Sequence, residues 1–346
     1  MSNTNSSATN GGGVVYTAKD FATDQDVRWC PGCGDYSILA QMQRTLPAMG
    51  IKREDIVFVA GIGCSSRFPY YMNTYGIHSI HGRATAVATG VKLANPELCV
   101  WVTAGDGDLM SIGGNHFIHL LRRNLDINII LFNNKIYGLT KGQYSPTSEL
   151  GKVTKSTPFG SLDYPVNPIS LALGAKSTFS ARAMDRDPKH LQEMIVRCCE
   201  HKGTSFLEVF QNCNIFNDGA FALYTEKDTR DDHVLYLENG KPMIFGKQKN
   251  LGIKLDGMKP IIIDINKDGN SINDVVVHNE KSRELAFVLS EFAEHPEFPA
   301  PMGVFLDIER ETFEERLTAQ TNLVKEREGE KDFDTLLRGS STWEIN

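Results

Sequence analysis

Polar residues with metal-binding chemistry stand where two predicted strands end. Asp106 comes shortly after an apolar run at 100–103, and Asn133 and Asn134 directly follow a second run at 127–132. Both runs have the composition of buried strands in a parallel sheet, and the carboxyl ends of such strands meet at one edge, where open α/β folds bind their ligands. A carboxylate and an amide oxygen suit Mg²⁺, which is usually shared with substrate phosphates. The two segments therefore predict a magnesium site.

The residues around Asp106 also suit a diphosphate. Gly105 and Gly107 let the backbone approach such a group closely, and the amides at the start of the following helix would face its charge. We predict that this crossover helix spans 115–123. Its apolar face would consist of Phe117, Ile118, Leu120 and Leu121. Two strands and one crossover helix make a βαβ unit.

A second glycine-containing loop follows an apolar strand expected at 56–60. It reads Gly-Ile-Gly-Cys-Ser-Ser-Arg over 61–67 and consists of the small residues that lie against phosphates. It is similar to a truncated dinucleotide fingerprint. The third glycine is missing and no acidic residue follows at the ribose-binding distance, so the pattern disfavours NAD.

Four of the seven cysteines could bind a metal together. Cys30-Pro-Gly-Cys33 places two thiols within reach of one centre, Cys64 lies in the second glycine loop, and Cys213 follows a predicted strand. Four thiolates accept either Zn²⁺ or an iron-sulfur cluster. In the alternative, only the Cys-x-x-Cys pair binds metal and the other thiols are buried apolar groups. For Cys99, Cys198 and Cys199 we expect burial.

Composition restricts the class of protein. The chain has 346 residues, of which 41% are hydrophobic and 23% charged, and a net charge of -7. This is ordinary for a globular protein, and the negative charge argues against nucleic acid and anionic membranes as partners. No apolar run approaches the roughly 18 residues of a membrane span, and the N-terminus shows no signal pattern. We therefore expect a cytoplasmic protein with reduced cysteines.

The chain divides into three parts. Residues 1–15 have almost nothing to bury and read as a disordered leader, 16–219 as an α/β domain with a doubly wound, mostly parallel sheet, and 220–346 as a smaller mixed α+β extension. The polar stretch 144–167 reads as an ordered active-site loop. Residues 175–179 read as a strand, and 233–237 with 242–245 read as a hairpin around Asn239-Gly240.

Gly-Asp-Gly at one strand end with Asn-Asn at the next resembles the signature of thiamine diphosphate enzymes. Aligned on that signature, the Mg²⁺ ligands would be Asp106, the side-chain oxygen of Asn134 and the backbone carbonyl of Ile136.

Six motifs in order resemble the β subunit of 2-oxoacid:ferredoxin oxidoreductases. They are Cys-Pro-Gly-Cys-Gly-Asp-Tyr, Gly-Ile-Gly-Cys-Ser-Ser-Arg, Ile-His-Gly-Arg-Ala, Gly-Asp-Gly-Asp, Asn-Asn-Lys-Ile-Tyr-Gly-Leu-Thr-Lys-Gly-Gln and Gln-Asn-Cys. The resemblance is dense over 29–219 and loose in the last third. It implies the thiamine diphosphate-binding type of fold.

The resemblance also implies cofactors and partners. Cys30, Cys33, Cys64 and Cys213 would bind one [4Fe-4S] cluster, which favours iron over zinc. Thiamine diphosphate would serve as the electron sink for decarboxylation, the cluster would pass electrons to ferredoxin, and coenzyme A would accept the acyl group. A partner α subunit would supply the glutamate that activates thiamine, in an αβ pair or an (αβ)₂ assembly. The cofactor-contacting positions would be Ile62, Gly63, Cys64, Ser65, His81, Gly82, Arg83, Ala84, Gly107, Asp108, Gly138 and Leu139.

Two cations bear on the choice of substrate. Arg67 follows the Cys-Ser-Ser loop and Lys141 follows Tyr-Gly-Leu-Thr, so both could recognise a second carboxylate and select 2-oxoglutarate over pyruvate. Leu-Thr-Lys-Gly-Gln is also more similar to the 2-oxoglutarate branch of the family. In the alternative, these cations contact the diphosphate or solvent. His81 could transfer a proton or only hydrogen-bond the cofactor.

Three other functions fit parts of the pattern. The substrate could be pyruvate or a broad range of 2-oxoacids. A non-redox thiamine decarboxylase or carboligase subunit would use Asp106 and Asn134 without a cluster. A non-catalytic subunit would hold structural zinc on the four cysteines.

Overall fold

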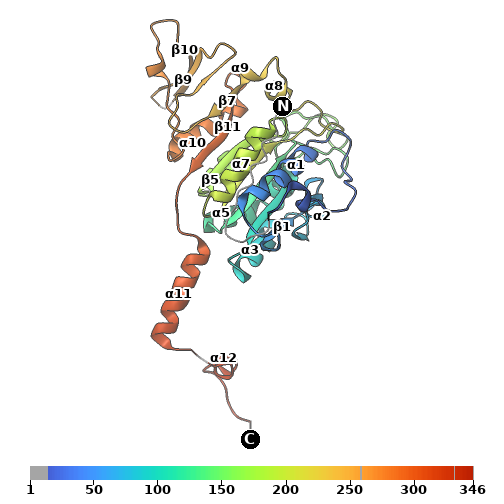
Figure 1. Cartoon of the computed structure of the whole chain (residues 1–346), viewed down its shortest axis with the longest axis vertical. Helices are drawn as coiled ribbons and strands as arrows, with labels where there is room; N and C mark the ends of the chain where they lie inside the picture. Colours follow the sequence, from blue (N-terminus) through green and yellow to red (C-terminus); the bar gives the residue numbers. More distant parts are fainter. Residues whose placement is uncertain (1–14, 258, 331, 346) are drawn as a thin grey trace.

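The computed structural model describes residues 15–257, 259–330 and 332–345. The leader expected at 1–15 therefore lies outside the described residues, except for its last one. An α/β body carries a small second sheet and a long C-terminal arm (Figure 1).

An eight-stranded sheet forms the centre of the body. Its order is β2 (Tyr75–His78), β1 (Ile56–Ala60), β3 (Cys99–Gly105), β4 (Ile127–Asn133), β6 (Ser205–Phe210), β5 (Phe179–Met184), β11 (Ala300–Asp307) and β7 (Val234–Leu237). The first six strands pair in parallel, β11 is antiparallel to β5, and β7 is parallel to β11. The expected α/β class with a mostly parallel sheet is confirmed.

Helices cover both faces of this sheet because successive side chains of a strand point to opposite faces. Val57 and Val59 of β1 pack in one apolar core, and Phe58 packs in the other. The first core includes residues of α3 (Ala84–Ala94), α5 (Gly114–Arg123), α6 (Pro168–Gly174) and α10 (Arg283–Ser290). The second includes residues of α1 (Asp35–Thr45), α2 (Phe68–Tyr71) and α7 (Pro188–Glu200).

The predicted βαβ unit is present in the middle of the sheet. Strands β3 and β4 are parallel neighbours, with Val100 opposite Ile127. Between them the chain forms the short helix α4 (Asp106–Met110) and then α5. Both strand ends therefore lie at the same edge of the sheet, as expected.

The last third of the chain shares the sheet and core of the body. It contributes β7 and β11 to the main sheet and Leu235 and Phe305 to the first core. A separate antiparallel sheet contains β8 (Ile244–Phe245), β9 (Leu251–Asp256) and β10 (Lys259–Asp264). Helices α11 (Phe313–Glu328) and α12 (Phe333–Arg338) then extend away from the body (Figure 1).

Short helices complete the fold. The α-helical ones are α8 (Ala222–Thr225) and α9 (Arg230–His233), and the 3-10 helices are η1 (Ala18–Phe21), η2 (Leu46–Met49), η3 (Arg53–Asp55), η4 (Ser65–Arg67), η5 (Ile272–Asp274) and η6 (Phe292–Glu294). Among the described residues, no helix has the length and apolar composition needed to cross a bilayer.

Two predicted elements are wrong. Residues 175–178 form the exit of α6, with Lys176 in a left-handed conformation (φ 68°), and strand β5 begins only at Phe179. The expected hairpin partners, β7 and β8, are not paired: β7 pairs with β11 and β8 pairs with β9. The turn itself is present, because the Lys241 amide donates to the Glu238 carbonyl at 3.0 Å and Gly240 has a φ of 75°.

Candidate active site

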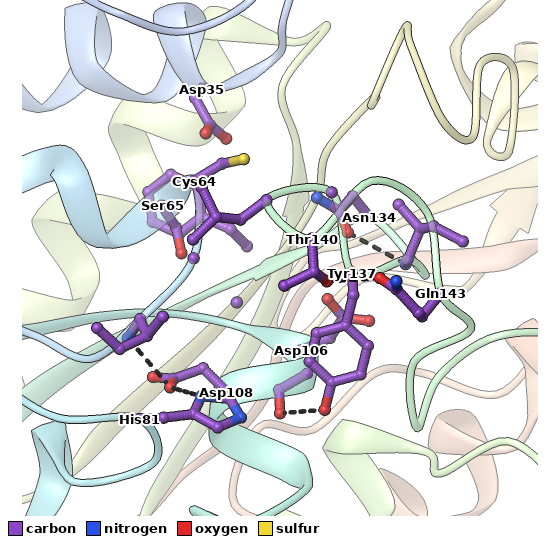
Figure 2. Close-up of a pocket in the computed structure, with 18 residues that line it drawn as sticks. Asp35, Cys64, Ser65, His81, Asp106, Asp108, Asn134, Tyr137, Thr140 and Gln143 are labelled. Atoms are coloured by element: carbon purple, nitrogen blue, oxygen red, sulfur yellow. Dashed lines mark hydrogen bonds and ion pairs between the residues drawn. The ribbon is translucent and has the colours of Figure 1, made fainter. Parts of the chain in front are cut away.

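A cavity of about 540 Å³ lies at the carboxyl ends of the central strands. Figure 2 shows Asp106 and Asn134 on one side of it and Cys64 with Asp35 on another. Twelve of the predicted site residues border it: Ile62, Gly63, Cys64, Ser65, His81, Asp106, Gly107, Asp108, Asn134, Ile136, Gly138 and Leu139. The fold thus gathers the three metal-ligand candidates of the thiamine signature around one space.

Asp106 is the first residue of α4 and is only 2% exposed. Its Oδ2 atom accepts hydrogen bonds from Ser145 Oγ at 2.5 Å and from Thr147 Oγ1 at 2.6 Å. Burial raises the pKa of Asp106 to about 6, and the two hydroxyl groups oppose that rise. The protein therefore holds a buried carboxyl group in place, and a cation would stabilise its charged form.

The loop after β4 presents the other two oxygen candidates. The Ile136 amide donates to Asn134 Oδ1 at 3.2 Å, so the side chain of Asn134 folds over its own loop. The loop is closed by a bond from the Tyr137 amide to the Gln143 carbonyl at 2.9 Å. Asn217 Nδ2 donates to the Asn134 carbonyl at 2.9 Å. These bonds fix the loop beside Asp106.

Gly107 is required by a packing contact that the sequence did not indicate. A Cβ atom at this position would lie 2.2 Å from the ring of Tyr137, a contact that no side chain could make. The Tyr137 hydroxyl donates to the Gly107 carbonyl at 2.9 Å (Figure 2). This glycine of the motif therefore makes room for the tyrosine of the loop after β4.

Asp108 holds two other loops of the pocket together. Its Oδ1 atom accepts from the Ile62 amide at 3.1 Å and from the Gly82 amide at 2.7 Å, and it contacts His81 Nδ1 at 2.6 Å (Figure 2). His81 thus borders the cavity while its Nδ1 atom is engaged by the protein. Gly82, Arg83 and Ala84 do not border the cavity; they lie at the start of α3.

Three buried oxygen atoms of residues that border the cavity have no hydrogen-bond partner among the described residues. They are Ser65 Oγ, Asp35 Oδ2 and Asp108 Oδ2. Unpaired buried polar atoms are costly and usually mark a missing ligand, ion or water. Their presence fits a pocket that takes a polar cofactor, with Ser65 on the glycine loop facing it.

The segments that carry Cys64 and Cys213 meet at Gly138. A Cβ atom at this position would lie 3.6 Å from both Cys64 Sγ and Cys213 Sγ. Gln211 Nε2 lies 3.4 Å from Cys33 Sγ, Trp29 Nε1 donates to the Cys64 carbonyl at 2.7 Å, and Asn214 Nδ2 donates to the Pro31 carbonyl at 2.6 Å. Three segments that are distant in sequence are thereby tied together.

The electrostatics of these thiols depend on burial and on one another. Burial raises the pKa of Cys64 to about 12, with further contributions from Asp35, Cys213 and Cys30. The pKa of Cys33 is also raised, first by burial and then by Asp35, and Cys64 and Cys213 contribute to it. The pKa values of Cys33 and Cys64 are thus raised in part by neighbouring cysteines, and a cationic iron centre would offset the charge of the thiolates. Within the described residues, no group of three or more His, Cys, Asp and Glu side chains could hold a metal ion.

The two predicted substrate cations lie outside this cavity. Arg67 borders a neighbouring hollow with Arg28 and Tyr70, and its Nη1 atom donates to the Arg28 carbonyl at 3.4 Å. Lys141 is exposed, has a φ of 75°, and follows Gly138, Leu139 and Thr140, which border the cavity.

Sequence reasoning missed several residues of the site. Asp35, Tyr137, Thr140 and Gln143 border the cavity, and Ser145 with Thr147 binds Asp106. Tyr137, Thr140 and Gln143 stand in the quoted Asn-Asn motif, so their position in it was a usable signal. Ser145 and Thr147 stand in the polar loop 144–167, where only the fold shows which hydroxyl groups turn inward.

The fold and the pocket define a thiamine diphosphate-binding domain. Residues 61–209 match the family model described as "Thiamine pyrophosphate enzyme, C-terminal TPP binding domain". This range contains β3, β4 and the loops that follow β1, β3 and β4, and therefore the candidate oxygen ligands Asp106, Asn134 and Ile136.

Two relatives give a narrower family than the domain model does. The chain is 47% identical to the 2-oxoglutarate oxidoreductase subunit KorB of Mycobacterium tuberculosis over 95% of its own length and 88% of that protein. It is 48% identical to 2-oxoacid:ferredoxin oxidoreductase 1, subunit beta, of Aeropyrum pernix, over 59% of this chain and 63% of that one.

A solved structure gives the same family. The 2-oxoglutarate:ferredoxin oxidoreductase from Magnetococcus marinus, with 2-oxoglutarate, coenzyme A and succinyl-CoA bound, superimposes with a TM-score of 0.73 at 32% identity over 93% of this chain and 94% of that one. The chain belongs to the β subunits of the 2-oxoacid:ferredoxin oxidoreductases, as its motifs predicted.

Proposed function

We propose that this chain is the catalytic β subunit of a 2-oxoglutarate:ferredoxin oxidoreductase. The reaction converts 2-oxoglutarate and coenzyme A to succinyl-CoA and CO₂ and delivers two electrons to oxidised ferredoxin, and it is reversible as reductive carboxylation. The observation that carries the proposal is the juxtaposition of Asp106, Asn134 and Ile136 with Cys64 around one cavity. The residues proposed to hold magnesium diphosphate and one of the cysteines proposed to bind iron thus border the same space.

Magnesium and thiamine diphosphate would bind at the strand ends. Asp106, Asn134 Oδ1 and the Ile136 carbonyl would hold Mg²⁺, which prefers oxygen ligands. Ser65, whose hydroxyl has no partner among the described residues, would bind a polar group of the cofactor. When bound, thiamine diphosphate supplies the electron sink for loss of CO₂. The chain's own contribution is to orient it and to exclude water.

A [4Fe-4S] cluster would be held by Cys30, Cys33, Cys64 and Cys213. The support is that Cys64 and Cys213 both approach Gly138, which borders the cofactor cavity. Cys64 borders that cavity as well, so the electron acceptor would be adjacent to the site of decarboxylation. All seven cysteines are free thiols, which suits the reducing cytoplasm in which we place the enzyme.

A partner α subunit would complete the site. Among the described residues that border the cavity none is a glutamate, whereas thiamine activation in this family needs one. The glutamate would come from the α subunit, in an αβ or (αβ)₂ assembly. The remaining cofactor contacts predicted at Gly82, Arg83 and Ala84 would be indirect, through the loop that carries His81.

Lys141 and Arg67 would recognise the second carboxylate of 2-oxoglutarate. Lys141 stands between Thr140 and Gln143, which both border the cavity, so its ammonium group would act at the rim. Arg67 borders the separate hollow that is also lined by Arg28 and Tyr70. His81, held by Asp108, would serve to orient the cofactor or to transfer a proton through its other ring nitrogen.

The test is anaerobic co-purification with the partner subunit, followed by visible spectroscopy. The oxidised complex is expected to be brown and to bleach when 2-oxoglutarate and coenzyme A are added, and to reduce ferredoxin. Pyruvate is the matched control, and equal bleaching by it would make the enzyme a pyruvate or broad 2-oxoacid oxidoreductase. A colourless complex that still decarboxylates 2-oxoglutarate would instead be a non-redox thiamine enzyme. Zinc bound without thiamine diphosphate would overturn the catalytic assignment.

A further inference from the structure

A chain of buried hydrogen bonds leads away from Asp106 into the sheet. Thr147 Oγ1, which lies 2.6 Å from Asp106 Oδ2, is also 3.0 Å from Asn133 Oδ1. Asn133 Nδ2 donates to Glu208 Oε1 at 2.7 Å, and Arg182 Nε donates to Glu208 Oε2 at 2.7 Å. All five side chains are at most 3% exposed.

The far end of the chain is an ion pair inside the protein. Arg182 on β5 and Glu208 on β6 face each other across the parallel ladder. The Arg182 guanidinium lies between the rings of Phe210 and Phe305, at 5.0 and 5.2 Å from their centroids, and its Nη1 atom donates to the Pro301 carbonyl at 3.4 Å. Burying an ion pair is often no more stabilising than apolar packing, so such a pair suggests a role beyond stability.

Glu208 determines which way the amide of Asn133 points. An ionised carboxylate only accepts hydrogen bonds, so Asn133 must turn its Nδ2 toward Glu208 and its Oδ1 toward Thr147. The Thr147 hydroxyl is thereby placed between two acceptors, Asn133 Oδ1 and Asp106 Oδ2. Its single hydrogen bonds to one of them at a time, and the shorter contact, at 2.6 Å, is the one to Asp106. The Lys135 amide also donates to Asn133 Oδ1, at 3.3 Å, which fixes the amide from the loop side.

We propose that Glu208 and Arg182 are positioning residues for the cation site: through Asn133 and Thr147 they fix the side-chain conformation of Asp106. This inference rests on the proposed function, because Asp106 is taken to be a magnesium ligand. Neither residue borders the cofactor cavity; both border a second cavity of about 560 Å³ on the other side of Asn133 and Thr147. Their effect on the cation is therefore indirect.

The test measures cation affinity rather than turnover. In the complex with its partner subunit and saturating thiamine diphosphate, Mn²⁺ replaces Mg²⁺, and binding is followed by loss of the free-ion resonance signal. Glu208→Gln keeps the side-chain volume but removes the charge that holds Arg182 and orients Asn133. Loss of a partner that orients a metal ligand typically weakens metal binding about 10- to 100-fold, so we expect a loss of about tenfold.

A double-mutant cycle tests the route. Thr147→Val removes the hydroxyl group at nearly constant volume and is expected to weaken Mn²⁺ binding by about tenfold on its own. Because Glu208 acts through Thr147, Glu208→Gln is expected to have little further effect in the Thr147→Val background. Equal losses in both backgrounds would mean that Glu208 does not act through Thr147 and would overturn the proposal.

The matched control is Glu280→Gln. It breaks another ion pair of the same kind, Arg197–Glu280 at 2.8 Å, whose residues do not border the cofactor cavity. Its Mn²⁺ affinity should stay within about twofold of that of the unmodified complex.

Other outcomes are equally decisive. Mn²⁺ affinity within twofold of the unmodified complex for Glu208→Gln overturns the proposal. If Glu208→Gln does not assemble with its partner subunit, Thr147→Val alone tests the proposal. Unchanged Mn²⁺ affinity in Thr147→Val would show that Glu208 does not act on Asp106 through Thr147. If the unmodified complex itself binds no Mn²⁺ with thiamine diphosphate, the proposed function fails instead.

Discussion

The proposed magnesium ligands and the proposed cluster ligands are positioned in different ways, and we call the two sets the oxygen wall and the sulfur wall. The oxygen wall, which consists of Asp106, Asn134 and Ile136, stands on the ends of β3 and β4 in the middle of the sheet. The proposed sulfur wall consists of Cys30, Cys33, Cys64 and Cys213, of which Cys64 borders the cavity. These residues stand on loops that meet through contacts between distant segments. Asp106 is 2% exposed, whereas Cys30 is exposed and the other three thiols are partly exposed.

The difference concerns what holds each wall in place. Hydroxyl groups of the protein bind Asp106 without any cofactor. The thiols of the sulfur wall have raised pKa values at Cys33 and Cys64, because burial disfavours their charged form. We infer that the oxygen wall is preorganised and that the sulfur wall acquires its final form when iron binds. A substitution that disrupts one wall should therefore leave ligand binding at the other wall intact.

The largest expected effect is that of removing Asp106, the central residue of the proposed magnesium site. Asp106→Ala should weaken Mg²⁺-dependent binding of thiamine diphosphate by more than about 100-fold, since loss of a ligand exceeds the 10- to 100-fold effect of losing its supporting partners. Titration calorimetry measures this. The visible spectrum of the cluster should be unchanged, and Asp26→Ala, at an exposed aspartate, is the control. Loss of the cluster in Asp106→Ala would contradict the independence of the walls.

Removing a sulfur should have the converse effect. Cys213→Ser is expected to abolish the visible absorption and ferredoxin reduction, because a complete thiolate set is needed to hold the cluster. Binding of thiamine diphosphate with Mg²⁺ should stay within about threefold, because the oxygen wall does not depend on Cys213. Cys199→Ala, which alters a thiol on α7 outside the pocket, should keep its colour. If Cys213→Ser also lost binding of thiamine diphosphate, the oxygen wall would depend on the sulfur wall.

A smaller effect is expected for the two proposed substrate cations, which lie outside the cavity. Lys141 follows the loop of the oxygen wall and Arg67 follows that of the sulfur wall. Lys141→Ala should lower kcat/KM for 2-oxoglutarate about tenfold with little change for pyruvate, since one charge-assisted bond contributes about 1.5–3 kcal/mol. Arg67→Ala should have the weaker effect, because Arg67 borders a separate hollow. If Arg67→Ala had the larger effect, the second carboxylate would be recognised mainly by Arg67. Lys155→Ala is the control for loss of a surface charge.

The last expected effect is on folding stability alone and concerns packing within the oxygen wall. Gly107→Ala would drive a methyl group into the Tyr137 ring and should lower the free energy of unfolding by about 1–3 kcal/mol, as overpacking does. Denaturant unfolding measures this loss. In a Tyr137→Leu background the same change should be less costly, because the ring is gone. An equal loss in both backgrounds would show that the clash is not with Tyr137.

The sequence predicted the oxygen wall better than it predicted the remaining strands. The unit around Asp106 is local: two apolar strands, one amphipathic helix and their loops lie within a short stretch of chain, and all are present. The three proposed metal ligands then fall at one edge because parallel strands share their direction. For the sulfur wall, the resemblance implied which cysteines belong together, and the fold brings their segments close.

Strand β5 was missed because its pattern contradicts the usual signal. It reads Phe-Ser-Ala-Arg-Ala-Met, and its buried Arg182 is neutralised by Glu208 on the neighbouring strand. No local pattern shows that an arginine has such a partner. The false hairpin has a related cause: the Asn239-Gly240 turn is encoded locally, but the partners of β7 and β8 are set by β11 and β9 elsewhere in the chain.

Asp108 joins parts of the pocket that belong to different crossovers of the sheet. One oxygen of its carboxylate binds the amides of Ile62 and Gly82 and the ring of His81. The loop after β1 and the segment before α3 therefore share one acceptor atom, and a substitution that removes the Asp108 carboxylate would release both of them.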